Sequence, residues 1–315
     1  MAGIVSRVLI VGGTGHMGRR LVRASLKLGH PTYVLFRDEN INDMEKVELV
    51  LDFKRAGAHL VSGSFNDRES LMRAVKAVDV VVSAVAGNHI QDAILEQLKL
   101  VDVIKEAGHI KRFIPSEYGM DPDRMLMANA LPPGNQLFKD KSKVRRAIEE
   151  AGIPHTYVSG NCYAAYFLGG LGQIAMGHVP PRQHVTLYGD GNVKAVWNDE
   201  MDIAMYVIKT VDDPRTLNRA IFVRPPKNIL SQREVVQIWE KLIGHELQKT
   251  QISAEDWLKT AQGKPIGVEV AIVHNIHLFY EGCLANFELS NDEEASKLYP
   301  DVEYTTVEEY LKRYV

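Results

Sequence analysis

The stretch SRVLIVGGTGHMGRR, residues 6–20, contains the strongest structural signal in the chain. Its apolar run Val8–Val11 breaks into glycines, and an apolar helical pattern resumes after Gly18. This order predicts a strand, a tight turn and a helix. In such a turn, Gly12 and Gly15 let the backbone pass close to a dinucleotide pyrophosphate, and free N–H groups of the helix face its negative charge. The stretch therefore predicts a dinucleotide site rather than a tight turn alone.

Strand-like and helix-like segments alternate through the first half of the chain, which indicates a parallel sheet with helices on both faces. Gly29, Gly57, Gly108 and Gly152 each follow a predicted helix, where a residue with positive φ ends it. We therefore expect an α/β fold with a Rossmann-type doubly wound parallel sheet over residues 1–160, joined by about 193–223. The predicted strands are 7–11, 32–36, 59–62, 78–84, 112–115 and 155–159, and the predicted helices are 18–28, 47–56, 68–75, 91–107 and 142–151.

The alternation ends after residue 160. Segments 231–243 and 253–260 have helical patterns that begin at serines, which are typical N-caps. Short strands are predicted at 185–188 and 221–223. Because the second of these strands suits the large sheet, we expect residues 161–315 to form mainly a smaller α/β substrate-binding lobe, interleaved in sequence with the large domain.

Composition excludes several classes of function. The 315 residues are 45% hydrophobic with a formal net charge of -3, so nothing favours nucleic acid or an anionic membrane as a partner. No apolar run reaches the roughly 18 residues of a membrane span, and the N-terminus lacks a secretory pattern. We therefore expect a cytoplasmic protein with a small-molecule partner. Cys162 and Cys283 are too few for a disulfide framework or a metal site, so we expect free thiols.

The residue after the second predicted strand indicates which cofactor binds. Arg37 stands nineteen residues after Gly18, where a carboxylate would accept hydrogen bonds from the ribose of NAD and an arginine can pair with the 2′-phosphate of NADP. We therefore expect NADPH. The alternative is that Arg37 is a solvated strand end and that the adjacent Asp38 selects NAD.

The residue that transfers a proton beside this cofactor does not follow from the glycine motif. Many enzymes with this glycine spacing reduce carbonyls with a Tyr followed four residues later by Lys, and no Tyr of this chain has Lys there. Lys141 is the best candidate, because it falls near the start of helix 142–151, with Arg145 one turn further on. A helix N-terminus and a like charge both lower the pKa of an amine, which suits a general base. The alternative is a solvated row of basic residues.

Two further motifs leave alternatives open. Ser116 and Glu117, in PSEYGMDPDRM after the fifth predicted strand, either shape a nicotinamide pocket or cap the next segment. His274, three residues before His277 in AIVHNIHLFYEGC, either lines a substrate site or is a hydrogen-bonded core residue.

Long motifs carry a resemblance over essentially the whole chain. The sequence resembles the plant family of pinoresinol-lariciresinol, isoflavone and phenylcoumaran benzylic ether reductases, which are atypical, NmrA-like short-chain reductases. PSEYGMDPDRM and YGDGNVK resemble its lignan branch most. Other motifs that carry the resemblance are VLIVGGTGHMGRR, GHPTYVLFR, VRRAIEEAGIPHTYVSGNCYAAYF, RPPKNILSQREVVQIWEKL and EASKLYPDVEYTTVEEYLKRYV.

The resemblance also implies functional residues. It implies Lys141 as the catalytic base and a homodimer as the assembly. It implies that NADPH is bound by Gly12, Thr14, Gly15, His16, Met17, Gly18 and Arg37, with Lys46 as a weaker contact, and that the nicotinamide lies near Ser83, Ala84, Asn161 and Tyr163. Asn88, His89, Ile90, Met120 and His274 are then expected at the substrate.

The chemistry implied is opening of a benzylic cyclic ether: the para-phenol loses its proton, a quinone methide forms, and hydride is added to the benzylic carbon. The alternatives are a phenylcoumaran or isoflavone reductase and a non-catalytic NADP-sensing regulator. The loop AVAGNHIQDAILEQ, residues 84–97, departs from the relatives' pattern at Gln91, Asp92 and Ala93. The choice between pinoresinol, lariciresinol or both as substrates is therefore open.

Overall fold

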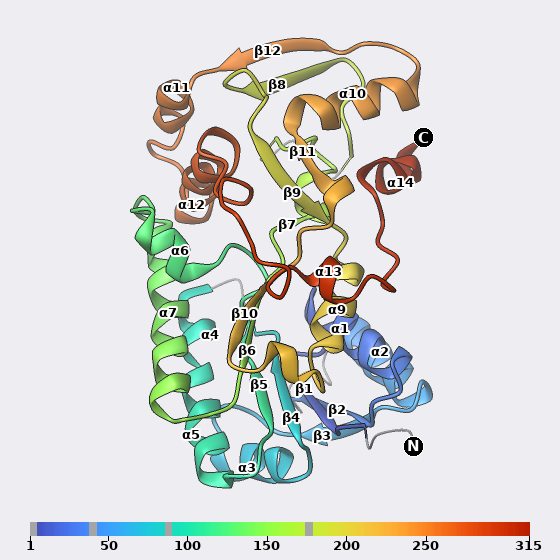
Figure 1. Cartoon of the computed structure of the whole chain (residues 1–315), viewed down its shortest axis with the longest axis vertical. Coiled ribbons are helices and arrows are strands. Elements are labelled where there is room, and N and C mark those ends of the chain that lie inside the picture. The colour runs from blue at the N-terminus through green and yellow to red at the C-terminus, as the bar shows by residue number, and fades with distance from the viewer. Residues whose placement is uncertain (1–4, 38–42, 86–89, 174–178) are drawn as a thin grey trace. The chain divides into compact units, whose positions relative to one another are not determined.

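The computed structural model of the chain describes residues 5–37, 43–85, 90–173 and 179–315. It divides into two units, each assembled from three separate segments of sequence (Figure 1). Unit 1 contains residues 1–117, 140–158 and 203–221, and unit 2 contains residues 118–139, 159–202 and 222–315. The division differs from the predicted boundary at residue 160, because residues 118–139 group with unit 2, and only 203–221 of the stretch 193–223 group with unit 1.

Unit 1 is built on a five-stranded parallel sheet in the order β3-β2-β1-β4-β5. Every residue of the central strands β1 and β4 is buried, as in a parallel sheet covered on both faces. Figure 1 shows α1 and α2 on one side of this sheet and α3 and α5 on the other. The predicted doubly wound fold is confirmed. The strands are β1 (Val8–Val11), β2 (Thr32–Phe36), β3 (His59–Ser62), β4 (Val80–Ser83) and β5 (Arg112–Ile114).

Two further strands extend the edge of this sheet. A bridge between Phe113 and His155 leads from β5 to β6 (Thr156–Ser159), and β6 pairs in turn with β10 (Arg219–Phe222). The expected return of a late segment to the large sheet is therefore confirmed for β10.

The helices of unit 1 follow the caps that the sequence offers. Asp43 and Asp67 accept backbone N–H bonds at the starts of α2 and α3. The four glycines predicted to end helices all have positive φ, between 65° and 98°. The helices are α1 (Gly18–Lys27), α2 (Met44–Arg55), α3 (Arg68–Lys76), α4 (Ile90–Leu95), α5 (Gln97–Ala107), α7 (Asn135–Glu150) and α9 (Glu200–Lys209), of which α7 and α9 begin in unit 2.

Two predicted helices were wrong in their bounds. The single helix over 91–107 is two helices, α4 and α5, which meet at Glu96. The helix predicted over 142–151 begins seven residues earlier, at Asn135. Its buried face carries Lys141 and Arg145 together with Phe138 and Ile148, so charged residues interrupt the apolar period by which helices are recognised.

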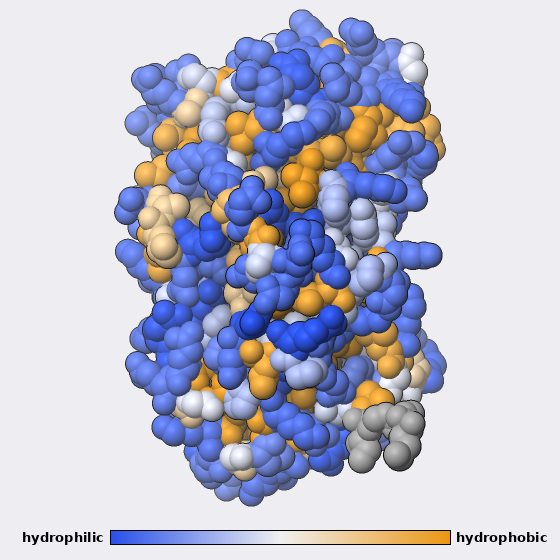
Figure 2. Space-filling model, in the orientation of Figure 1, coloured by the Kyte–Doolittle hydropathy of each residue, from blue (hydrophilic) through white to orange (hydrophobic). Residues whose placement is uncertain are grey.

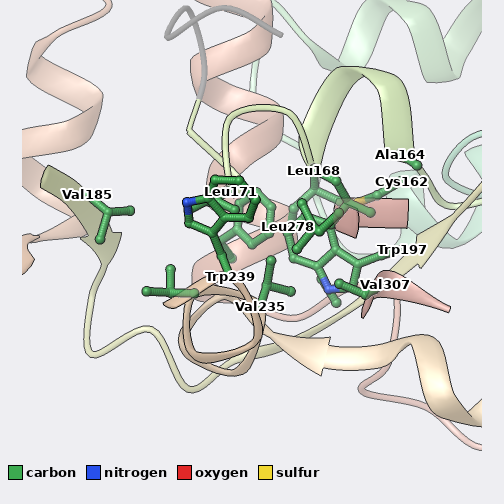
Figure 3. Close-up of a cluster of buried hydrophobic side chains, with 14 of the residues drawn as sticks. Cys162, Ala164, Leu168, Leu171, Val185, Trp197, Val235, Trp239, Leu278 and Val307 are labelled. Carbon is green, nitrogen blue, oxygen red and sulfur yellow. The ribbon is translucent and has the colours of Figure 1, made fainter. Parts of the chain in front are cut away.

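Unit 2 has two small sheets, β11-β9-β7 and β12-β8, packed with helices around a cluster of buried side chains (Figure 3). Trp197 and Trp239 are buried in this cluster, and their indole N–H groups donate to the carbonyls of Leu230 and Pro181. Its strands are β7 (Cys162–Tyr163), β8 (His184–Tyr188), β9 (Lys194–Asn198), β11 (Ile229–Ser231) and β12 (Gln248–Ile252).

The predicted serine caps of unit 2 are confirmed. Ser231 forms a capping box with Glu234, and Ser253 accepts the N–H of Asp256. A π-helical turn, Ile276–Tyr280, follows α12 and was not predicted. The helices are α6 (Pro122–Met127), α8 (Ala164–Phe167), α10 (Gln232–Ile243), α11 (Ala254–Lys259), α12 (Ile266–Asn275), α13 (Ala295–Leu298) and α14 (Val307–Leu311).

The surface in Figure 2 is mostly hydrophilic, with hydrophobic residues scattered over it. Within the described ranges, none of the helices has the length and apolar character needed to cross a membrane. Cys162 and Cys283 are free thiols, as expected.

The C-terminal segment of unit 2 is fastened to acidic residues at the start of α9. Asp202 accepts the N–H of Thr305 at 2.7 Å, and Asp199 pairs with Arg313 at 2.9 Å. Burial, with a smaller contribution from the nearby Asp199, raises the pKa of the Asp202 carboxyl to about 6. The folded protein therefore binds this proton more tightly than the unfolded chain does.

We expect Asp202→Asn to stabilise the protein at pH 7.5 by about 1–3 kcal/mol, because the amide can still accept the Thr305 N–H without a buried charge. A raised carboxyl pKa lowers stability as pH rises from about 4 to about 6, so the gain should shrink toward pH 4.5. Urea unfolding of both proteins at each pH measures this. Asp102→Asn, at an exposed position of α5, is the control. An equal gain at both pH values would contradict the assignment.

Candidate active site

The glycine turn between β1 and α1 is closed by its own backbone. Gly12 has φ +83°, and a Cβ there would lie 2.6 Å from the carbonyl oxygen of Ala84, at the end of β4. A Cβ on Gly18 would overlap the Gly12 carbonyl, and the Gly15 N–H donates to that same oxygen at 3.0 Å. Both Gly12 and Gly18 are therefore required by packing inside the turn, whatever ligand it binds.

The start of α1 suits an anion. Met17 precedes the helix without a side-chain cap, and no acidic residue lies in the first turn. Arg19 and Arg20 turn back to donate to the carbonyls of Thr14, Gly15 and His16. No carboxylate of the helix therefore competes with a negatively charged ligand for its N-terminal N–H groups.

The other expected cofactor residues of unit 1 lie at the ends of its strands. Ser83 and Ala84 are buried at the end of β4, where the Ala84 N–H donates to Val11 at 2.8 Å. Arg37 is exposed directly after β2. Lys46, in the first turn of α2, pairs with Asp43 at 2.7 Å. Any anion at Lys46 therefore has a carboxylate as competitor.

Asp38, Asn88 and His89 lie outside the described residues. Ile90 is the first residue of α4.

Lys141 is buried in the second turn of α7. Only 8% of this residue is exposed, and its Nζ donates to the backbone carbonyl of Glu117 at 2.8 Å. Glu117 follows β5 after two further residues and is itself buried. The lysine is therefore not part of a solvated row of basic residues, which was the alternative that the sequence left open.

The position of Lys141 in α7 differs from the prediction. The prediction that Lys141 lies at a helix N-terminus is wrong, since α7 begins six residues before it and the helix dipole acts within the first turn. Arg145 does lie one turn further on, but two nitrogens of its guanidinium, Nε and Nη2, bind the Glu117 carboxylate. The distances are 2.7 Å from Nε to Oε1 and 2.5 Å from Nη2 to Oε2. The like charge that the sequence predicted is thus neutralised.

The loop after β5 is fixed by both of its polar residues. The Ser116 N–H donates to Gln97, and its hydroxyl donates to the carbonyl of Val85 at 2.9 Å. The alternative that Ser116 or Glu117 caps the next helix is wrong, because the side chain of Asp121 accepts the N–H at the start of α6. Ser116 and Glu117 instead hold the loop against α5 and α7 of unit 1.

Unit 2 brings two of its expected site residues together. Met120 and Asn161 line one small pocket, which is otherwise formed by residues of α6 and of the segments around Phe222 and Leu284. Asn161 has φ +65°, and its amide donates to the carbonyl of Val223 at 2.7 Å. Tyr163 stacks against Tyr166, with ring centroids 5.9 Å apart.

His274 lies at the segment that leads into α7. Its Nε2 donates to the carbonyl of Gly134 at 3.2 Å, and its ring lies 5.1 Å from that of Phe138. His277, on the π-helical turn, accepts the N–H of Leu131 at Nε2 and contacts Glu281 through Nδ1 at 2.6 Å. The described contacts of His274 are thus those of a hydrogen-bonded structural histidine, and its role toward a substrate stays a prediction.

The Glu117–Arg145 pair is the feature that sequence reasoning missed. The sequence predicts Glu117 as a pocket or cap residue and Arg145 as a positive charge near Lys141. Nothing in their spacing of 28 residues indicates that they meet. The fold brings them together, because Glu117 follows β5 and Arg145 lies on α7 in the same unit.

The sequence was compared with families of known proteins. Residues 5–311 match the model of the NmrA-like family. The chain belongs to the NmrA-like family.

Relatives of this NmrA-like chain include reductases of plant phenolics. A bifunctional pinoresinol-lariciresinol reductase of Linum album is 61% identical over 312 residues, which are 98% of this chain and 94% of the relative. A solved structure of AtPrR2 with NADP+ and (+)-pinoresinol is 55% identical, covers 99% of this chain and 100% of its own, and superposes with a TM-score of 0.95. An isoflavone reductase structure is 41% identical, with 99% and 100% coverage and a TM-score of 0.89.

We expect Gly18→Ala to destabilise this NmrA-like chain by about 1–3 kcal/mol or more, because the added Cβ meets backbone that has no room to move. Gly267→Ala, in α12, is the matched control. A Cβ there meets nothing within 4 Å, so helix propensity should make it neutral or slightly stabilising. Thermal unfolding of the two variants measures the difference. Equal midpoints would contradict the close packing assigned to Gly18.

Proposed function

We propose that the chain is an NADPH-dependent reductase that opens benzylic cyclic ethers of lignans, converting pinoresinol to lariciresinol and lariciresinol to secoisolariciresinol. One observation carries the mechanism: a buried lysine, Lys141, held at 2.8 Å by a backbone carbonyl after β5. The substrate class rests on the likeness to the Linum reductase and to the structure with NADP+ and (+)-pinoresinol.

The glycine turn and the start of α1 would hold the cofactor's phosphates. They fit this role because the helix N-terminus has neither a side-chain cap nor an acidic residue in its first turn. The exposed Arg37 would pair with the 2′-phosphate more readily than Lys46, which already pairs with Asp43. The residues proposed to bind NADPH are Gly12, Thr14, Gly15, His16, Met17, Gly18, Arg37 and Lys46, with Ser83, Ala84, Asn161 and Tyr163 at the nicotinamide. When bound, the cofactor supplies hydride.

Lys141 takes the proton from the para-phenol of the substrate, directly or through a water. The phenol has a pKa of about 10, close to that of an unperturbed lysine, so the transfer is nearly balanced. The phenolate then pushes electrons through the ring, the benzylic C–O bond breaks, and a quinone methide forms with an alkoxide as leaving group. Hydride addition to the benzylic carbon restores aromaticity. Lys141 returns its proton to the phenolate, and the alkoxide takes a proton from solvent, so each ether opened consumes one NADPH and one proton.

This chemistry accounts for the missing tyrosine. A carbonyl reductase needs an acid beside the carbonyl oxygen, which Tyr and a following Lys supply. An ether with a para-phenol instead needs a base at the far side of the ring, and one amine suffices. The residues proposed at the substrate are Asn88, His89, Ile90, Met120 and His274. A homodimer and a cytoplasmic location are further proposals, which light scattering and a fluorescent fusion would test.

We expect wild-type protein with NADPH to reduce pinoresinol, and Lys141→Ala to lower kcat by about 10²–10⁴ while the protein still folds. Lys141→Arg should not restore activity, because a guanidinium cannot accept the proton. Lys143→Ala is the matched control, since it removes an exposed lysine from the same helix. NADPH oxidation and chromatography of the lignan products measure these rates.

A pinoresinol with both phenols methylated tests the same mechanism from the substrate's side. It should be inert toward the wild-type protein, because it has no phenolic proton to lose. Normal reduction of this compound would contradict the quinone methide route. Near-normal turnover by Lys141→Ala would reassign the base, with His274 as the next candidate. Turnover of isoflavones or phenylcoumaran ethers in place of lignans would correct the substrate class, and no turnover at all would favour an NADP-sensing regulator.

A further inference from the structure

The ion pair between Glu117 and Arg145 takes no part in the reaction described above, yet it is among the most buried charged groups of unit 1. The two side chains are only 3% and 4% exposed. A buried pair costs the hydration of both charges, and replacing such a pair with apolar residues is often neutral or stabilising. Stability alone therefore gives little reason to keep it.

The pair is joined to Lys141 through a single residue. The carbonyl of Glu117 accepts from the Lys141 Nζ, and its carboxylate binds Arg145, four residues further along α7. Residues four apart lie one above the other on a helix. Glu117 therefore contacts α7 at two adjacent turns, at one with its backbone carbonyl and at the other with its carboxylate.

The Arg145 guanidinium also contacts an aromatic ring. Arg145 Cζ lies 4.3 Å from the ring centroid of Tyr157, on β6, so the planar group stacks over the ring. The Tyr157 hydroxyl donates to the Arg145 carbonyl at 3.3 Å and contacts Glu149 at 3.1 Å. Tyr157 thus holds the Arg145 guanidinium in place. The bidentate ion pair in turn fixes the orientation of the Glu117 side chain.

We propose that Glu117 and Arg145 are positioning residues for Lys141, which fix the place of its amine and balance the charge around it. The proposal rests on the proposed function, in which Lys141 is the base. It assigns to the carboxylate and the guanidinium equal and opposite effects on the ammonium form of Lys141. Removing either one takes away the ion-pair partner of the other, in a buried group of residues that also contains the amine.

The other ionisable groups near the pair constrain the pH range of a test. Tyr157 is held above its ordinary pKa and His155 below its own, in both cases mainly by burial. Neither group therefore changes charge between about pH 7 and 9.5. Arg112 on β5 and Glu149 on α7 are further charged neighbours of His155, and α7 also carries Asp140, Lys143 and Arg146.

The test is a pH titration of Lys141 by NMR, in full-length protein carrying lysine labelled with ¹³C at Cε, with NADP+ present. The signal is assigned by its loss in Lys141→Arg. We expect Glu117→Gln to lower the titration midpoint by about one unit, because Arg145 is left to repel the ammonium. Arg145→Gln should raise the midpoint by a similar amount, because the Glu117 carboxylate is left to attract it. The double variant should return it close to the wild-type value.

Turnover gives a second readout. Glu117→Gln and the double variant should lower kcat at least tenfold with KM changed less than threefold, because the amine is less firmly placed. Glu150→Gln is the matched control: it removes an exposed carboxylate from the last residue of the same helix, and should leave both the midpoint and kcat unchanged.

The outcomes separate this proposal from the proposed function. Midpoints that do not move, or that move in the same direction in both single variants, would overturn the charge balance whatever the enzyme reduces. Opposite shifts in a protein that reduces no benzylic ether would support the balance and contradict the function. If the single variants do not fold, the double variant decides, since it leaves no buried charge unpaired. Wild-type kcat in that variant would overturn the positioning role.

Discussion

The parallel alignment of β1, β4 and β5 is the constraint on which the rest of unit 1 depends. In a parallel sheet every strand ends at the same edge, so segments far apart in sequence meet there. The pairing of Val11 with Ser83 and of Val82 with Ile114 places the glycine turn, Ser83–Ala84 and the loop of Glu117 along one edge. The close approach of Gly12 to Ala84 is a direct result of this register. An uncapped helix start and a buried lysine thus belong to a single edge of the sheet.

Burying the charged residues around Lys141 costs folding free energy and fixes the position of the amine. Lys141, Arg145 and Glu117 are three charged residues with less than a tenth of each exposed. Their mutual bonds offset the loss of water, and removing any one of the three takes a hydrogen-bond partner away from a buried group. A lysine on the surface would cost less folding free energy, but its side chain could adopt many conformations. The arrangement favours a fixed amine over a stable core, which is what proton transfer at a defined distance requires.

The sequence predicted the parts of this structure that local rules govern. The strand, turn and helix around Gly12 and Gly18, the glycines that end helices and the serine caps all follow from residue type and spacing. The start of α7 could not be predicted, because Lys141 and Arg145 occupy the positions where apolar residues mark a buried face. Lys141 does not lie at the helix N-terminus on which its prediction as a base rests, and nothing in the sequence indicates that Glu117 contacts both Lys141 and Arg145. A long-range ion pair leaves no periodic signal in the sequence, so the contact between Glu117 and Arg145 could not be predicted.

The central claim is that this chain delivers hydride to the benzylic carbon of an ether opened by phenol deprotonation. The most direct measurement is the product formed from pinoresinol with NADPH deuterated at C4 of the nicotinamide, analysed by mass spectrometry and NMR. The account requires a single deuterium at each benzylic carbon whose C–O bond has broken, with one NADPH oxidised for each ether opened. Ring-opened product without deuterium at that carbon, or NADPH oxidised while the ether stays intact, would contradict it.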